Sequence, residues 1–473
     1  MINNLTQILT RWTETFSGWI SIPLIIILLG SGVFVSIRLR WIQLRKLGHS
    51  FDVVGGKYDN PEDEGDVTHF QALSAALSAT IGIGNIAGVA LAVRLGGPGA
   101  LFWMWITALF GMALKYSECT LSHHFRVIHE DGSASGGPMY YIERGLGPKW
   151  KPLAVFFATL AVICSFCTGN MNQANTIAQT FMTYHIPTWF SGAVIAFLVG
   201  LVIIGGIRRI AAVASRLVPG MAILYVGSSL LILLMNYPRV IPAFVSVFTE
   251  AFSLKAGWGG LLTVMMWGVR RGLYSNEAGQ GSAPIAHAAA KTKESVREGA
   301  VALMGPFVDT IIVCSMTGLT ILTTGVLQTT DLTGAQLTRE AFRTGLTFAP
   351  GLGSIIVNAS VLLFAYSTMV AWSYYGDRSI EYLLGPRAVK PYRWVYVFFN
   401  FLGAVLPLAF VWNFGDIALS LMTIPNLIGV IFLTRVLTTM TDDYFSRRHL
   451  TYREYLEQKA LAGATAQGSS GQS

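Results

Sequence analysis

Long apolar runs recur along the whole of this 473-residue sequence, and they constrain its fold more than any other feature. A helix needs about 20 mostly apolar residues to cross a bilayer. The runs predict eleven transmembrane helices, near residues 17–37, 70–95, 99–122, 152–183, 189–206, 213–236, 258–290, 298–327, 350–376, 393–412 and 415–437. Three of these runs, 152–183, 258–290 and 298–327, exceed the length of a straight crossing. Such length indicates a tilt, an interruption or an extension beyond the bilayer.

The chain carries too little charge for a soluble protein. Only 12% of its residues are charged and 53% are hydrophobic, whereas soluble domains carry about 25% charged residues. We therefore predict an all-α polytopic membrane protein that is surrounded by membrane lipid. The first run has no basic segment before it and no small-residue cleavage site after it. We interpret it as a spanning helix rather than a signal peptide.

The distribution of Lys and Arg predicts how the helices are oriented. If the N-terminus lies outside, most of the 33 basic residues fall in cytoplasmic segments. The basic residues of the outer segments are then Arg11, Arg94, Arg239, Lys255, Arg339 and Arg343. Cytoplasmic loops are enriched in Lys and Arg, so we predict an outside N-terminus and a cytoplasmic C-terminus. The net charge of +8 is then a signal of topology, and we expect no nucleic-acid partner.

The apolar runs and their connections divide the chain into six parts. We expect an extra N-terminal transmembrane helix over 1–40, a cytoplasmic connection over 41–69, a first five-helix repeat over 70–236, an extracellular connection over 237–257, a second five-helix repeat over 258–438 and a cytoplasmic tail over 439–473. The small polar residues from Leu461 onward are typical of disorder. Cys164 and Cys167 form a C-x-x-C pattern inside an apolar run, which favours helix packing over a metal or redox site.

Glycines interrupt the middle of the second apolar run, in the sequence Ser78-Ala-Thr-Ile-Gly-Ile-Gly-Asn85. Non-helical backbone in a membrane is tolerated only where it is buried in protein or lines a cavity. We predict an unwound hinge that offers carbonyl groups to a cation and N–H groups to a carboxylate. The alternative is a seam for helix contact, because Gly84 and Gly88 form a G-x-x-x-G pattern. The substrate-binding candidates here are Thr80, Gly82, Gly84 and Asn85.

A second break lies in the middle of the seventh run, in the sequence Gly272-Leu-Tyr-Ser-Asn-Glu-Ala-Gly-Gln-Gly-Ser282. So many polar residues at bilayer depth are costly unless they face a cavity or each other. The alternative is a loop between two re-entrant pieces, which would also line a cavity. The candidates here are Ser275, Asn276, Glu277 and Gly279.

The two breaks predict an internal symmetry. Each opens a unit of five runs, and the two units start from opposite sides of the membrane. Two inverted units that each begin with a broken helix place a binding site near the membrane midplane. We therefore expect a 5+5 inverted-repeat core, with the first apolar helix outside the repeat.

Two further polar clusters lie in the fourth and ninth runs. The sequence Thr168-Gly-Asn-Met-Asn-Gln-Ala-Asn175 supplies Asn170 and Gln173, whose amides suit either an amino acid or bonds between helices. The sequence Tyr366-Ser-Thr368 offers adjacent hydroxyl groups. Such hydroxyls are oxygen ligands for a hard cation, or they bond back to a carbonyl of their own helix.

Three charged residues inside predicted helices have open roles. Asp309 is a candidate for charge balance or coupling, because a lone acid in a membrane helix is costly. Arg270 and Arg271 precede the second break. Either arginine pairs with Glu277 or with a substrate carboxylate, or both extend to the outer surface.

Several long motifs resemble the alanine/glycine:cation symporter family, the sodium:alanine symporters of bacteria and archaea. They are SATIGIGNIAG from Ser78, GPGALFWMW from Gly97, GGPMYYIERGLG from Gly136 and RRGLYSNEAGQGSAPIAHAAA from Arg270. The resemblance covers nearly the whole chain. It implies an eleven-helix transporter of the bacterial or archaeal plasma (inner) membrane, with the bacterial leucine-transporter fold and sodium-driven uptake of alanine or glycine. Some members of the family take serine or glutamine.

A more distant resemblance to the neurotransmitter:sodium symporters places the ions. In that fold an Asn of the first broken helix meets one sodium, and Asn85 matches it. A hydroxyl pair on the eighth core helix ligates a second sodium together with carbonyls of the broken helix. Ser367 and Thr368 match the pair, and Ser78 and Ile81 would supply the carbonyls. The Ser-Asn-Glu stretch and its preceding arginines depart from that pattern, so the substrate contacts on that side cannot be carried over.

The sequence as a whole predicts a sodium-coupled symporter for a small neutral amino acid, acting as a monomer or weak oligomer and without an organic cofactor. Glu277 and Asp309 leave a proton-coupled carrier open as an alternative, and a glutamine or serine symporter is another. An enzyme is disfavoured because H-E-x-x-H and G-x-S-x-G motifs are missing. A channel is disfavoured because it would need a ring or a repeated filter, and the sequence has a single pair of breaks.

Overall fold

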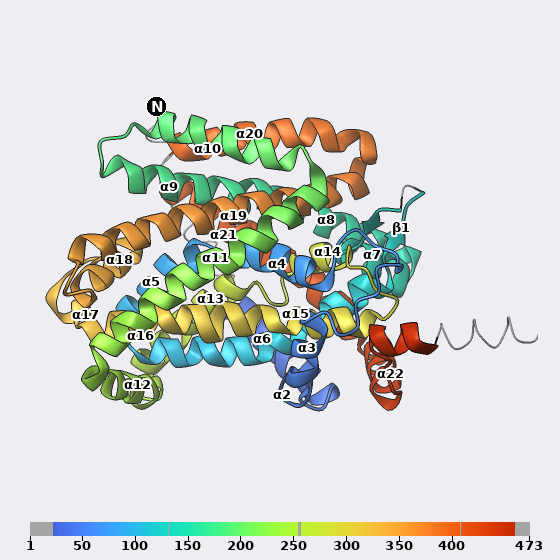
Figure 1. Ribbon diagram of the computed structural model, residues 1–473, viewed down its shortest axis with the longest axis horizontal. Helices are drawn as coiled ribbons and strands as arrows, with labels where there is room; N and C mark the ends of the chain where they lie inside the picture. The colour runs from blue at the N-terminus through green and yellow to red at the C-terminus, as the bar shows by residue number, and fades with distance from the viewer. Residues whose placement is uncertain (1–21, 131, 254–256, 407, 459–473) are drawn as a thin grey trace, which may run out of the picture.

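The computed structural model describes residues 22–130, 132–253, 257–406 and 408–458 (Figure 1). The start of the first predicted helix, Arg11, Lys255 and the polar tail from Leu461 lie outside the described residues. Most of the described chain is helical, and one two-stranded hairpin joins β1 (Val127–Ile128) to β2 (Ala134–Ser135). The prediction of an all-α architecture is therefore confirmed.

The first half of the chain forms one continuous series of helices. After an apolar helix over Ile22–Arg38, the series contains α2 (Ile42–Arg45), α3 (Leu47–Val54), α4 (His69–Thr80), η1 (Gly84–Gly88), α5 (Val89–Gly96), α6 (Gly99–His124), α7 (Pro138–Leu146), η2 (Pro148–Trp150), α8 (Lys151–Phe166), η3 (Cys167–Met171), α9 (Asn172–Met182), α10 (Thr188–Ile203), α11 (Gly206–Met235) and α12 (Tyr237–Ala251).

The second half continues in the same way. It contains α13 (Gly257–Asn276), α14 (Ala283–His287), α15 (Ser295–Pro306), η4 (Phe307–Cys314), α16 (Ser315–Thr324), α17 (Val326–Thr329), α18 (Gly334–Gly345), α19 (Pro350–Leu384), η5 (Pro386–Ala388), α20 (Val389–Val405), α21 (Leu408–Phe432) and α22 (Thr434–Ser446).

The described helices make this a multi-pass membrane protein. By length and apolarity, five of them can cross a membrane, or up to seven if each of two bent pairs counts as one crossing. The helices Ile22–Arg38 and Thr188–Ile203 are apolar but shorter than 18 residues.

Three of the membrane helices contain a π-helical segment. These segments are η1, η3 and η4, and each contains or adjoins polar residues that the sequence singled out. A π-bulge leaves part of the regular hydrogen-bond ladder unmade and is frequent at functional sites. The long runs 152–183 and 298–327 are thus continuous helices with a local widening, and the run 258–290 is interrupted.

Both predicted breaks are present. The second run bends by 53° between His69–Thr80 and Gly84–Gly96. In the seventh run α13 ends at Asn276, residues 277–282 are not helical, and the short α14 follows. The sequence does not predict a third feature, a 59° bend between Ile417–Phe432 and Thr434–Ser446.

The helices around the breaks form the interior of the bundle. The helices α13 and α15 both pack against α6, and α19 packs against α4, α8 and α11. Figure 1 shows α9, α10 and α20 together along one edge of the molecule, with α19 and α11 beside them. The first broken helix therefore packs against α11 and α19, and the second packs against α6.

Close packing of α13 on α6 depends on Gly268. A Cβ at this position would lie 2.3 Å from the backbone oxygen of Ala100 and 2.6 Å from the Cβ of Trp103. We expect Gly268→Ala to lower the unfolding temperature in detergent, because overpacking costs about 1–3 kcal/mol. Gly227→Ala is the matched control, since a Cβ at Gly227 meets nothing within 4 Å. Equal unfolding temperatures for the two variants would contradict this account of the α13–α6 contact.

Candidate functional site

The two breaks meet in the interior through Asn85. Its Oδ1 accepts a hydrogen bond from the Gly82 N–H at 2.9 Å. Its Nδ2 donates to Ser275 Oγ at 3.0 Å and to Asp309 Oδ1 at 2.6 Å. The Asn85 amide is fully buried. It bonds the Gly82 N–H that the first break leaves without a helical partner, and it connects this break to the end of α13 and to η4.

The carboxylate of Asp309 is the charged centre of this network. Its Oδ2 accepts hydrogen bonds from Ser275 Oγ at 2.8 Å and from Thr310 Oγ1 at 2.7 Å, in addition to the Asn85 bond on Oδ1. Asp309 and its three donors are buried. A buried charge needs this kind of compensation, because water is not there to solvate it. The sequence left the role of Asp309 open, and the structure assigns it these partners.

A second polar surface lies beside Gly82. A Cβ on Gly82 would lie 2.8 Å from Thr368 Oγ1 and 3.6 Å from Gln173 Oε1. Both of these side-chain atoms are buried and have no hydrogen-bond partner among the described residues. An unpaired buried polar atom costs about 1–3 kcal/mol. These two unpaired atoms therefore lie side by side next to the glycine of the first break.

Ser78 and Ser367 join the first break to α19. Ser78 Oγ donates to the Ser367 carbonyl at 2.9 Å, and Ser367 Oγ lies 3.3 Å from the Ser78 carbonyl. Ser367 Oγ also bonds back to the Phe364 carbonyl of its own helix at 2.9 Å. Ile81 ends α4 with φ −72° and ψ 88°, so its backbone leaves the helix next to Gly82. The four residues predicted to hold sodium thus converge on one region.

Three other candidates on the two broken helices make local or helix-packing contacts. Thr80 Oγ1 bonds back to the Ala76 carbonyl at 3.3 Å. Gly84 lies against Tyr274, where a Cβ would be 3.2 Å from Cδ1 of that ring. Asn276 Oδ1 accepts from the Ala278 N–H at 3.0 Å and so stabilises the turn that follows α13.

Glu277 and Gly279 shape the second break itself. Glu277 has φ +51° and Gly279 has φ +76°, and such a left-handed conformation is costly for a residue other than glycine. The two Glu277 carboxylate oxygens accept from Ser282 Oγ at 2.6 Å and Trp372 Nε1 at 3.2 Å. The Gly279 carbonyl accepts from Asn426 Nδ2 at 2.8 Å.

The side-chain amides of the fourth predicted helix have different neighbours. Asn170 bonds to α20. Its Nδ2 donates to the Tyr396 carbonyl at 2.7 Å, and its Oδ1 accepts from Asn400 Nδ2 at 2.9 Å. Asn170 is therefore a helix-packing residue, in contrast to Gln173. Thr168 Oγ1 and both polar atoms of the Asn172 side chain are buried and unpaired in the described part of the chain. A Cβ at Gly415 would lie 2.7 Å from Thr168 Oγ1 and 3.0 Å from Asn172 Nδ2.

Arg271 is buried and points toward the first break rather than to the outer surface. Its guanidinium lies over the rings of Trp267 and Tyr274, at 5.6 Å and 5.9 Å. A Cβ at Gly88 would lie 3.8 Å from the Cδ of Arg271. Gly84 and Gly88 therefore form a contact seam with α13, and the same stretch contains the hinge. The stretch SATIGIGNIAG therefore combines a bend with a helix-contact seam, and its predicted binding of a cation and a carboxylate stays a prediction.

Another buried carboxylate, on Glu298, joins the two broken helices at their other ends. Glu298 of α15 contacts His69 Nδ1 at 2.5 Å and also bonds to His287 Nδ1. The backbone next to it forms a bridge between Val67 and Ala290. The sequence does not single out this cluster, because its members lie far apart in the chain and share no motif spacing.

A family comparison decides what kind of protein carries this arrangement. The model of the sodium:alanine symporter family matches residues 5–458. The chain belongs to the sodium:alanine symporter family. This is a family of transporters, so the predictions of the family, of sodium-coupled transport and of a transporter rather than an enzyme are confirmed.

Three relatives match most of the chain. An uncharacterized transporter of Haemophilus influenzae is 46% identical over 437 residues, covering 91% of this chain and 94% of its own. The sodium/alanine symporter AgcS of Methanococcus maripaludis is 44% identical over 425 residues, 88% of this chain and 93% of its own. A putative sodium/proton-dependent alanine carrier protein, YrbD of Bacillus subtilis, is 38% identical over 458 residues, 93% of each chain.

The polar surface beside Gly82 predicts a sensitive position. We expect Gly82→Ala to reduce alanine binding by at least about tenfold, because the added methyl group would contact Thr368 Oγ1 and fill the space it faces. The measurement is the rise in unfolding temperature on addition of alanine in sodium buffer. Gly220→Ala is the control, since a Cβ there meets nothing within 4 Å. An alanine response of Gly82→Ala equal to that of the parent would exclude this surface as the ligand site.

Proposed function

We propose that the protein imports a small neutral amino acid, alanine or glycine, together with sodium by alternating access. The observation that carries this proposal is the pair of unpaired polar atoms, on Gln173 and Thr368, that face Gly82 inside a broken membrane helix. Membership of the sodium:alanine symporter family supports it. The relative AgcS, which is named as a sodium/alanine symporter, supports the choice of alanine.

We further propose eleven transmembrane helices in a 5+5 inverted repeat, with the N-terminus outside and the C-terminus in the cytoplasm. The contact between Asn85 and Ser275 supports this arrangement, because it brings the two breaks to one place. An inverted repeat has its binding site at such a junction. The distribution of Lys and Arg supports the orientation.

In the proposed sodium site the hydroxyls of Ser367 and Thr368 act with the carbonyls of Ser78 and Ile81. Sodium is a hard cation and takes oxygen ligands, as other hard cations do. The unpaired Oγ1 of Thr368 and the close approach of Ser78 to Ser367 fit such a donor set. A cation bound there would hold α4 against α19. It would stabilise one of the alternating states, which coupling requires.

The substrate binds beside Gly82 in this proposal. Gln173 Oε1 is an acceptor and suits the substrate ammonium group. The Gly82 N–H is not free as the sequence suggested, because it donates to Asn85. A substrate carboxylate therefore uses neighbouring N–H groups of the hinge or displaces that bond. A glycine at the centre of the site favours a small ligand, although one methylene changes preference by only about 1–3 kcal/mol.

Proton coupling is the second candidate function. The name of the relative YrbD includes both ions, and Asp309 and Glu277 are buried acids close to the breaks. Asp309 is the stronger of the two candidates, because it touches Asn85 and Ser275 directly. In the sodium mechanism the same carboxylate supplies negative charge close to the ion.

The deciding experiment is uptake of labelled alanine and glycine into proteoliposomes. We expect uptake with an inward sodium gradient and no uptake with potassium or with a proton gradient alone. Uptake driven by protons alone would move the coupling to Asp309 or Glu277. No uptake of either amino acid under any gradient would contradict the proposal and favour a larger substrate such as glutamine.

Thr368→Val tests the sodium site, because it removes one hydroxyl and keeps the shape of the side chain. We expect the sodium concentration for half-maximal uptake to rise by about tenfold or more, since a lost ligand in a buried site costs about 1–3 kcal/mol. The alanine KM at saturating sodium should change much less. Both values come from uptake at varied sodium and alanine concentrations.

Thr323→Val is the matched control for that variant. Thr323 is also buried, and its hydroxyl bonds back to the Leu319 carbonyl of its own helix. Unchanged sodium activation in Thr368→Val would remove Thr368 from the ion site.

A further inference from the structure

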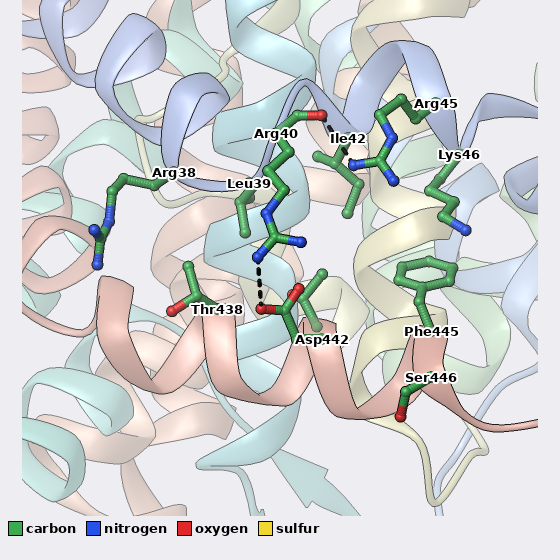
Figure 2. Close-up of a pocket in the computed structure, with 11 residues that line it drawn as sticks. Arg38, Leu39, Arg40, Ile42, Arg45, Lys46, Thr438, Asp442, Phe445 and Ser446 are labelled. Atoms are coloured by element: carbon green, nitrogen blue, oxygen red, sulfur yellow. Dashed lines mark hydrogen bonds and ion pairs between the residues drawn. The ribbon is translucent and has the colours of Figure 1, made fainter.

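A basic pocket lies where the first apolar helix ends. Its lining comes from the end of helix Ile22–Arg38, from α2 and from α22, and its volume is about 320 Å³. Figure 2 shows four basic side chains around it, with Arg40 reaching across toward α22. The lining residues are Arg38, Leu39, Arg40, Ile42, Arg45, Lys46, Thr438, Thr441, Asp442, Phe445 and Ser446.

The charges of this pocket are strongly unbalanced. Arg38, Arg40, Arg45 and Lys46 face one acid of the lining, Asp442. The Arg40–Asp442 ion pair is long, at 3.5 Å, and its side chains are 70% and 62% exposed. An exposed pair of this kind contributes about 0–1 kcal/mol. Arg40 can therefore exchange Asp442 for a stronger anion at little cost.

The backbone holds these cations in place before any ligand binds. Arg40 and Trp41 have φ values of +52° and +57°, a left-handed conformation that is strained for residues other than glycine. The turn is secured by the Trp41 N–H on the Ser36 carbonyl at 2.7 Å. Lys46 Nζ lies over the Phe445 ring at 4.2 Å, which keeps the ammonium group at the pocket.

Exposed apolar side chains surround the pocket on the side of the helix. Ile37, Trp41 and Leu44 are 59%, 40% and 62% exposed, and Ile26 and Phe34 are exposed further along the same helix. Large apolar side chains that are exposed along a membrane helix face lipid chains, and Trp is enriched at the membrane interface. The pocket therefore lies at the level of the lipid headgroups.

We propose that this pocket binds the phosphate headgroup of an anionic phospholipid, whose acyl chains lie along Ile37 and Phe34. Basic pockets between membrane helices are suited to such headgroups, and Arg presents a planar fork to phosphate oxygens. The lipid would join the first helix to α22. This inference rests on the membrane position in the proposed function, and it is independent of the coupling ion and of the amino acid.

Native mass spectrometry of the full chain in detergent tests the proposal, with phosphatidylglycerol and phosphatidylcholine of the same acyl chains as probes. We expect tighter binding of phosphatidylglycerol. The double variant Arg40→Gln with Lys46→Gln should bind it at least about tenfold more weakly, because two positive charges beside the phosphate are removed. Asp442→Asn should bind it more tightly, since the competing carboxylate is removed.

The control is the double variant Arg387→Gln with Lys390→Gln, which removes two exposed charges that do not line the pocket. Equal weakening by both double variants, or equal binding of the two lipids by the parent, would overturn the proposal. Displacement of phosphatidylglycerol by millimolar inorganic phosphate would also overturn it and assign the pocket to a soluble anion. Lipid binding without sodium-driven uptake would contradict the proposed function and leave the lipid site standing.

Discussion

The side chain of Asn85 is the interaction on which the centre of this protein depends. A helix can open inside a membrane only if its freed backbone groups find partners in the protein. Asn85 supplies a partner for the Gly82 N–H and at the same time bonds to Ser275 and Asp309. One amide therefore permits the first break, joins it to the second and orients a buried carboxylate. A side chain with both a donor and an acceptor is needed for this, and Asp or Leu could not replace it.

Two other buried carboxylates follow the same requirement. Glu277 has partners on both carboxylate oxygens, and Glu298 is bonded by two histidines. These contacts hold the second break against α19 and join α4 to α14. Gln173 Oε1 and Thr368 Oγ1, in contrast, have no hydrogen-bond partner among the described residues and both lie close to Gly82. In a low-dielectric interior an unpaired polar atom is costly, and this contrast is the basis for the substrate and sodium positions that we propose.

Much of the fold could be predicted because the relevant signals are local. Apolar length predicts helices, and the glycines around Gly82 and Gly279 predict interruptions, since glycine both weakens a helix and permits positive φ. The division of the fourth helix could not be predicted. Asn170 and Gln173 are three residues apart and chemically alike, yet one bonds to α20 and the other faces Gly82. Which amide meets which neighbour depends on how α9 and η3 are rotated against the bundle.

By itself, the sequence determined the class of protein, the positions of the two breaks, the convergence of polar residues on them and the family to which the chain belongs. These are properties of composition, periodicity and motif, which need no knowledge of contacts. Only the tertiary structure decided that Asp309 is bonded to both breaks, that Glu298 joins His69 to His287, and that basic residues after the first helix meet α22. Those contacts join residues far apart in the chain, and their pairing is set by helix packing, which no local pattern encodes.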